Sequence, residues 1–148
     1  MPSGRPRSGV TRDYDVRPMT EADLEESAAL HRQVHGFDRM NELRDALMAP
    51  GFAPVVAIRD DRVVAYATTL TFFPAAHGAA ISAQAMAALI TGATAGSDAP
   101  ASFLLPTRQQ ELFRWALEAG LRVVKPMTYM VIGQPHRPQG AWIPSVLY

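Results

Sequence analysis

The segment from residue 103 to residue 132, FLLPTRQQELFRWALEAGLRVVKPMTYMVI, constrains the fold more than any other part of the chain. It predicts a short apolar strand, a helix and a second strand in direct succession. Thr107 and Gln110 have the spacing of a capping box, and Gly120 stands where helices often end in a left-handed residue. One face of this helix is apolar, formed by Leu112, Phe113, Ala116 and Leu117. The segment therefore indicates a β-α-β unit whose helix covers a sheet.

The preceding residues predict more elements of both kinds. Residues 14–18 indicate a short strand, and Thr20 with Asp23 marks the start of a helix that reaches about His35. A second helix is expected after Asp38, ended by Pro50-Gly51. Residues 53–59 and 62–73 should then form a hairpin that turns at Asp60-Asp61, and a further helix is expected over residues 82–91. This order predicts an α/β fold with a mixed, mostly antiparallel sheet flanked by helices.

Length and composition predict one domain. Of the 148 residues, 48% are hydrophobic, enough for a single core over residues 14–148. Residues 1–13, with three arginines and almost nothing apolar, are expected to form a flexible tail, whereas the apolar end of the C-terminal tail, residues 135–148, should pack.

Charge and residue usage exclude several classes of partner. Basic and acidic residues number 14 each, which argues against nucleic acid. There is no cysteine and no apolar run of membrane-spanning length, so we expect a soluble protein of the cytoplasm that does not enter a membrane.

Three phrases carry a family resemblance that covers residues 14–132. The phrases VRPMTEADLEESAALH, VVAIRDDRVVAYAT and LFRWALEAGLRVV occur in the order found in the GNAT N-acetyltransferases, which the chain resembles. The LLPTR and WIPSVLY phrases are similar to the second halves of double-module GNAT proteins. The resemblance implies a GNAT-like domain. It implies acetyl-CoA as the cofactor if the protein is active, and no cofactor otherwise. The partner that it implies is a second copy of the chain, in a homodimer, or a companion GNAT module.

The family's pyrophosphate-binding loop has no good counterpart. That loop needs glycines, because a Cβ blocks close approach of backbone to phosphate. Ala79, Ala80, Ile81, Ser82 and Ala83 are the residues that the resemblance places there. In one alignment, His77 replaces the basic or amide residue of the loop, with Ala80 and Ser82 at glycine positions. In the other, which we prefer, residues 77–82 form the fourth strand, Ser82 caps the next helix, and no phosphate loop exists.

The usual proton donor of the family is also missing. Many relatives carry a tyrosine on the late helix where this chain has Ala116, so a surviving activity would need another acid, with Tyr66 and Tyr129 as candidates. The sequence therefore predicts a noncatalytic or weakly active GNAT-like domain that stabilises or regulates a partner or binds a small molecule. The alternative is an active acetyl-CoA-dependent transferase that acts on a small-molecule or peptide amine.

His31 and His35 lie four residues apart on the inward face of the first predicted helix. Zinc would need a third ligand, and no acidic residue at matching spacing supplies one, so we expect no metal. The two histidines are expected to lie in the interior or to line the substrate cleft that GNAT relatives form near this helix.

Overall fold

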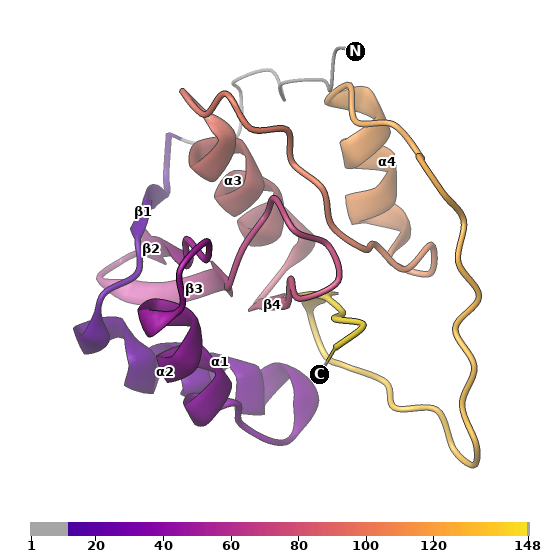
Figure 1. The fold of residues 1–148 in the computed structure, drawn as a ribbon, viewed down its shortest axis with the longest axis horizontal. Helices are drawn as coiled ribbons and strands as arrows, with labels where there is room; N and C mark the ends of the chain where they lie inside the picture. Colours follow the sequence, from indigo (N-terminus) through magenta and orange to yellow (C-terminus); the bar gives the residue numbers. More distant parts are fainter. Residues whose placement is uncertain (1–11, 148) are drawn as a thin grey trace.

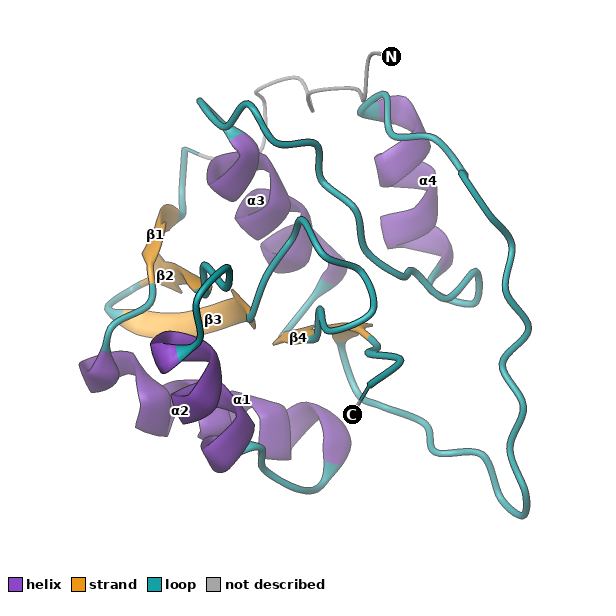
Figure 2. Ribbon diagram, in the orientation of Figure 1, coloured by secondary structure: helices purple, strands orange, loops and turns teal. Residues whose placement is uncertain are grey.

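The computed structural model describes residues 12–147, and a five-stranded antiparallel sheet lies at its centre (Figures 1 and 2). The strands follow one another across the sheet in chain order, and each pairs antiparallel with the next. They are β1 (Asp15–Pro18), β2 (Val55–Arg59), β3 (Arg62–Ala67), β4 (Gly78–Ala80) and β5 (Ala141–Ile143). The predicted α/β class with helices flanking the sheet is confirmed.

Helices cover both faces of this sheet (Figure 1). One face packs against α1 (Leu24–His35) and α2 (Met40–Met48), which follow the short 3-10 helix η1 (Glu21–Asp23). The other face packs against α3 (Ala83–Thr94), and α4 (Gln110–Glu118) lies against α3. Alternate residues of a strand point to opposite faces, so Ala65 and Ala67 join the α3 core while Tyr66 joins the α1 core.

The hairpin between β2 and β3 has the turn that the sequence predicted. Asp60 and Asp61 have φ angles of +51° and +58°, as a two-residue type I′ turn requires at both positions. Short polar side chains tolerate this backbone conformation better than most residues. The turn fixes Arg59 opposite Arg62 and so sets the register of the two central strands.

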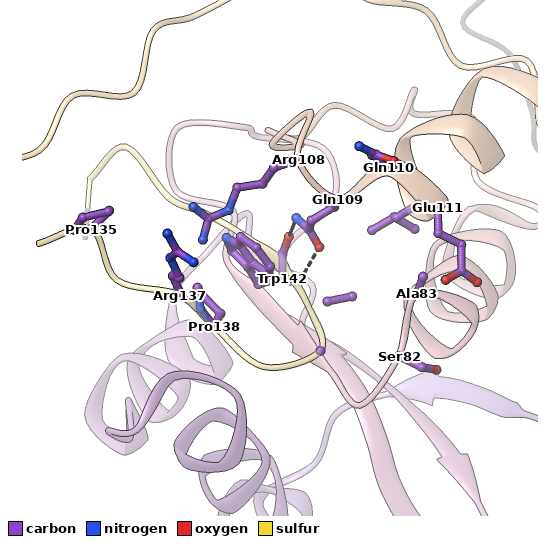
Figure 3. Close-up of a pocket in the computed structure, with 13 residues that line it drawn as sticks. Ser82, Ala83, Arg108, Gln109, Gln110, Glu111, Pro135, Arg137, Pro138 and Trp142 are labelled. Carbon is purple, nitrogen blue, oxygen red and sulfur yellow. Dashed lines mark hydrogen bonds between the residues drawn. The ribbon is translucent and has the colours of Figure 1, made fainter.

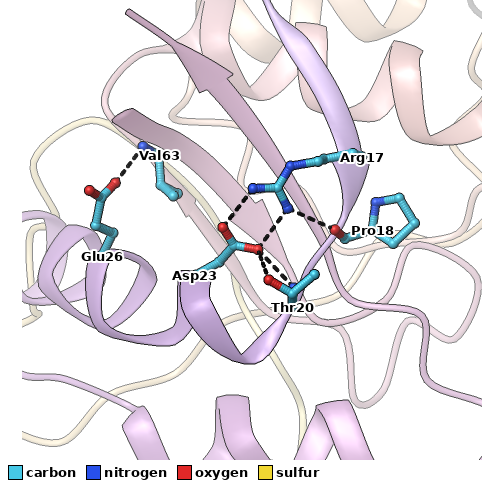
Figure 4. A network of polar contacts seen from close by, with 6 residues as sticks. All are labelled: Arg17, Pro18, Thr20, Asp23, Glu26 and Val63. Atoms are coloured by element: carbon cyan, nitrogen blue, oxygen red, sulfur yellow. Dashed lines mark hydrogen bonds and ion pairs between the residues drawn. The ribbon is translucent and has the colours of Figure 1, made fainter. Parts of the chain in front are cut away.

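A polar network ties the first strand to the first helix (Figure 4). The Arg17 guanidinium donates two hydrogen bonds of 2.7 Å to the Asp23 carboxylate, which also accepts from the backbone and hydroxyl of Thr20. The Arg17 hydrogen bonds lower the pKa of Asp23 to about 2. Glu26 extends the network by accepting from the Val63 amide on β3 at 2.8 Å. The predicted Thr20-Asp23 capping box is therefore present, with its acid held charged.

Packing between α3 and the sheet depends on small side chains. Alanines line both surfaces, and Gly92 of α3 lies so close to β1 that a Cβ on it would meet the Val16 side chain at 2.5 Å. The helix therefore approaches the strands closely at this point.

The predicted strands on either side of α4 are not formed. Residues 103–106 pack in part on the core without pairing, and residues 121–132 form an extended, largely exposed segment. A strand needs a neighbouring strand, and the place beside β4 is taken by β5, from the predicted apolar C-terminal tail. The β-α-β prediction was therefore wrong in its strands and right in its helix. The C-terminal tail, expected to pack, does so at Ile143, whereas Val146 and Leu147 are exposed.

The ends of the helices agree with the sequence in part. Gly120 has φ +92° after α4, as predicted, but the N-cap residue of α4 is Gln109 instead of Thr107. The helix after Asp38 begins one residue later than a cap at Asp38 would place it, with Arg39 as N-cap.

Residues 1–11 of the predicted flexible tail lie outside the described residues. Within residues 12–147, no helix has both the length and the apolar character needed to cross a membrane.

Candidate functional site

A buried hydrogen-bonded cluster joins α1 to the centre of the sheet. Tyr66 of β3 is fully buried, and its hydroxyl lies 2.5 Å from Nδ1 of His31 and 3.3 Å from Nδ1 of His77. His31 comes from α1, and His77 stands directly before β4. A tyrosine hydroxyl can donate to one imidazole and accept from the other, so it can bond to Nδ1 of both rings at once. The cluster holds the first helix against the two central strands.

All four histidines of the chain line up from this cluster toward the surface. The ring of His35 stacks on that of His31 at 4.3 Å between centroids, and the exposed His136 lies 5.6 Å beyond His35. Trp142 of β5 meets His35 edge-on at 6.4 Å. His31 and His35, predicted as interior or cleft residues, therefore lie together, the first buried and the second partly exposed.

Burial controls the protonation of these side chains. Desolvation lowers the pKa of His31 and of His77 to about 3 and that of His35 to about 4, with smaller contributions from neighbouring histidines and Arg39. Nε2 of His31 is buried without a hydrogen-bond partner among the described residues, so an added proton would find no acceptor there. The three rings are therefore neutral at physiological pH.

The two predicted acid candidates have different surroundings. Desolvation raises the pKa of Tyr66, and its hydroxyl is occupied by two histidines and closed to solvent. Tyr129 is 75% exposed on the segment after α4. Tyr66 lies with His31 and His35, whereas Tyr129 has no place in the cluster.

The residues predicted for cofactor binding lie where β4 leads into α3. Ala79 and Ala80 are buried strand residues, and Ser82 is the N-cap of α3, its hydroxyl accepting from the Ala85 amide at 3.1 Å. This is the arrangement of the preferred alignment, in which a strand runs straight into a capped helix. Only Ile81 and Ser82 separate the two elements.

β5 and the loop before it lie against this junction. β5 pairs with β4 residue by residue, so Ala80 lies opposite Ala141. A Cβ on Gly140 would stand 2.5 Å from the Ala80 carbonyl oxygen, which shows how closely the preceding loop covers the junction. A phosphate cradle needs glycines and open backbone amides at the helix start, and here Ile81, Ser82 and Ala83 each carry a Cβ.

A cleft of about 670 Å³ opens beside this junction (Figure 3). It lies between the N-terminal turns of α3 and α4 and the segment that leads into β5. Its polar lining includes Arg108, Gln109, Glu111 and Arg137, and Trp142 contributes its ring. The volume lies in the range of small-molecule sites.

Arg108, Arg137 and Trp142 are site residues that sequence reasoning missed. Arg108 precedes Arg137 by 29 residues along the chain and precedes Trp142 by more, and no sequence motif links the three. The apolar phrase around Trp142 indicated packing, and only the pairing of β5 with β4 brings that residue beside Arg108.

Comparisons with known proteins do not identify a family. No family model matches the chain, and no curated protein and no solved structure matches it. Among residues 12–147, no group of three or more histidine, cysteine or acidic side chains is arranged to hold a metal ion. The function must therefore be argued from the site itself.

Proposed function

We propose that the chain is a GNAT-like domain that does not transfer acetyl groups and instead binds a small ligand in the cleft beside α3 and α4. The resemblance of residues 14–132 to GNAT proteins supplies the family, and the α/β fold is compatible with it. The noncatalytic role is inferred from the local geometry.

One observation carries the proposal: β5 pairs with all three residues of β4, and Ser82 caps α3 almost directly after that strand. The family's chemistry requires a phosphate cradle at this helix start and room for a thioester next to the fourth strand. In this chain Ser82 caps α3, and β5 fills the edge of β4. Opening that edge would break the β4–β5 pairing, so access for acetyl-CoA would cost folding free energy.

The surroundings of Tyr66 give independent support. A general acid must reach the leaving group, directly or through one water. Tyr66 is buried, and its hydroxyl is held between His31 and His77. The side chain thus has a structural role in the core, and no tyrosine stands at Ala116 to replace it.

We further propose a partner, either a second copy of the chain or a companion GNAT module, acting in the cytoplasm. The extended segment after α4 supports a partner because it exposes many apolar side chains, including Val124, Met130 and Ile132. Contiguous exposed apolar surface of this kind is typical of interaction sites.

Calorimetry with acetyl-CoA, followed by an assay for released coenzyme A thiol, tests the proposal. The chain has no cysteine, so a thiol reagent reports only coenzyme A. We expect no binding of acetyl-CoA at millimolar concentration and no thiol release with a panel of primary amines. Micromolar binding together with amine-dependent thiol release would support the active transferase and overturn the proposal.

A further inference from the structure

Two guanidinium groups converge in the cleft without a carboxylate between them. Figure 3 shows the side chains of Arg108 and Arg137 reaching toward each other beside Trp142. The ion pairs found among the described residues involve other arginines, Arg17, Arg32 and Arg59. Like charges brought together without a counter-ion repel, so this end of the cleft is suited to an anion.

Two contacts fix the position of Arg108, and the ring that it contacts is itself held in place. Its guanidinium lies 5.2 Å from the centre of the Trp142 ring and donates to the carbonyl oxygen of His136 at 3.1 Å. The neighbouring Gln109 clamps Trp142 by donating to its carbonyl oxygen at 2.7 Å and accepting from its amide at 3.0 Å. An arginine held in this way loses little side-chain entropy when it binds a ligand.

The far end of the cleft carries the opposite charge. Glu111, in the first turn of α4, points toward the α3 start, and Figure 3 places its carboxylate well apart from the two guanidiniums. A ligand with a second anionic group would be repelled there. A cationic or neutral far end would be accepted.

We propose that the cleft binds a small phosphate monoester, with the phosphoryl dianion on Arg108 and Arg137 and an uncharged or cationic end toward Glu111. This ligand class rests on the proposed function, because it assigns the cleft to a ligand other than acetyl-CoA. Two guanidiniums match the charge of a phosphoryl dianion and offer it paired N–H donors, whereas a single carboxylate would leave one positive charge uncompensated. A cleft of about 670 Å³ has the size for a small molecule.

Calorimetry with two probes of similar size tests the proposal. O-phosphoethanolamine carries an ammonium group at its far end, and 2-phosphoglycolate carries a carboxylate. We expect the unmodified protein to bind O-phosphoethanolamine about 3- to 10-fold more tightly than 2-phosphoglycolate. The ammonium of the first is attracted by Glu111 and the carboxylate of the second is repelled by it, both within a Debye length. The Glu111→Gln variant should lose this preference while still binding both probes.

Arginine variants test the anion end. Arg137→Gln should weaken the binding of O-phosphoethanolamine about 10- to 100-fold, because the variant lacks one charged hydrogen-bond donor. Arg44→Gln is the matched control, since it removes the same charge from an exposed position on α2 and should leave binding unchanged. Circular dichroism would establish that each variant is folded.

The outcomes separate this inference from the proposed function. If neither phosphate ester binds at millimolar concentration, or if Arg137→Gln and Arg44→Gln weaken binding equally, the ligand class is wrong. The noncatalytic role would stand in both cases, since it is decided by acetyl-CoA binding and thiol release.

Discussion

Two buried histidines, His31 and His77, and the partly exposed His35 should make the free energy of unfolding strongly dependent on pH below neutrality. Burial lowers the pKa of His31 and His77 to about 3 and that of His35 to about 4, whereas an unfolded histidine has a pKa of about 6.5. The unfolded chain therefore binds more protons than the folded chain between these limits. The stabilisation is complete above the unfolded pKa and is lost as pH falls toward the folded values.

The size of the effect follows from proton linkage. At pH 5.5, each such histidine lowers the free energy of unfolding by about 1.4 kcal/mol relative to high pH, and three together lower it by about 4 kcal/mol. That loss is a large part of the 5–15 kcal/mol or so that stabilises a typical domain. Urea unfolding at pH 7.5 and pH 5.5, followed by circular dichroism, measures the difference directly.

Two variants sharpen this experiment. His31→Gln removes one of the three rings, so the loss between pH 7.5 and 5.5 should fall to about 3 kcal/mol. Gln33→Asn, at an exposed position of α1 that carries no titratable group, should keep the loss of the unmodified protein. A free energy of unfolding that changes by less than about 1 kcal/mol over this range would refute the reasoning, because it would mean that the folded protein takes up the protons as readily as the unfolded chain.

Three other substitutions test packing and polar contacts, each by urea unfolding at pH 7.5. Tyr66→Phe should lower the free energy of unfolding by about 1–3 kcal/mol, because it leaves two buried imidazoles without the hydroxyl that they share. An unchanged free energy of unfolding would contradict the structural role of the cluster. Gly92→Ala should destabilise by about 1–3 kcal/mol although alanine favours helices, and the same change made on a Val16→Ala background should cost less, since the clash partner is gone. Asp23→Asn should lower the free energy of unfolding by about 1–2 kcal/mol, because the pair with Arg17 lowers the pKa of Asp23 to about 2. The loss is limited because Arg17 is 39% exposed and solvent partly screens the pair. An unchanged free energy would show that the pair is fully screened.

Local signals in the sequence were reliable where the backbone decides the structure alone. The Asp60-Asp61 turn, the Thr20-Asp23 capping box and the Ser82 cap of α3 depend on neighbouring residues, and each was found where predicted. The preferred alignment around residues 77–82 rested on the same kind of signal. That alignment predicted from the sequence alone that no phosphate loop precedes α3.

Strand pairing was the point at which sequence patterns failed. Residues 121–132 are rich in strand-forming side chains, yet they remain outside the sheet because β5 occupies the edge of β4. A period-2 or apolar pattern indicates that a segment can form a strand but says nothing of which edge is open to it. The cleft could not be predicted from the sequence for the same reason, because Arg108 and Trp142 come into contact only through the pairing of β5 with β4.

The sequence by itself determined the balance of charge, and it determined the helices, the central hairpin and the short connection into α3 because these depend on residues a few positions apart. Only the tertiary structure decided which strand borders β4, that His31 and His77 meet at Tyr66, and that two arginines converge beside Trp142. The physical reason is that contacts between distant residues are chosen by competition for the same buried space, and that competition is settled by the whole fold.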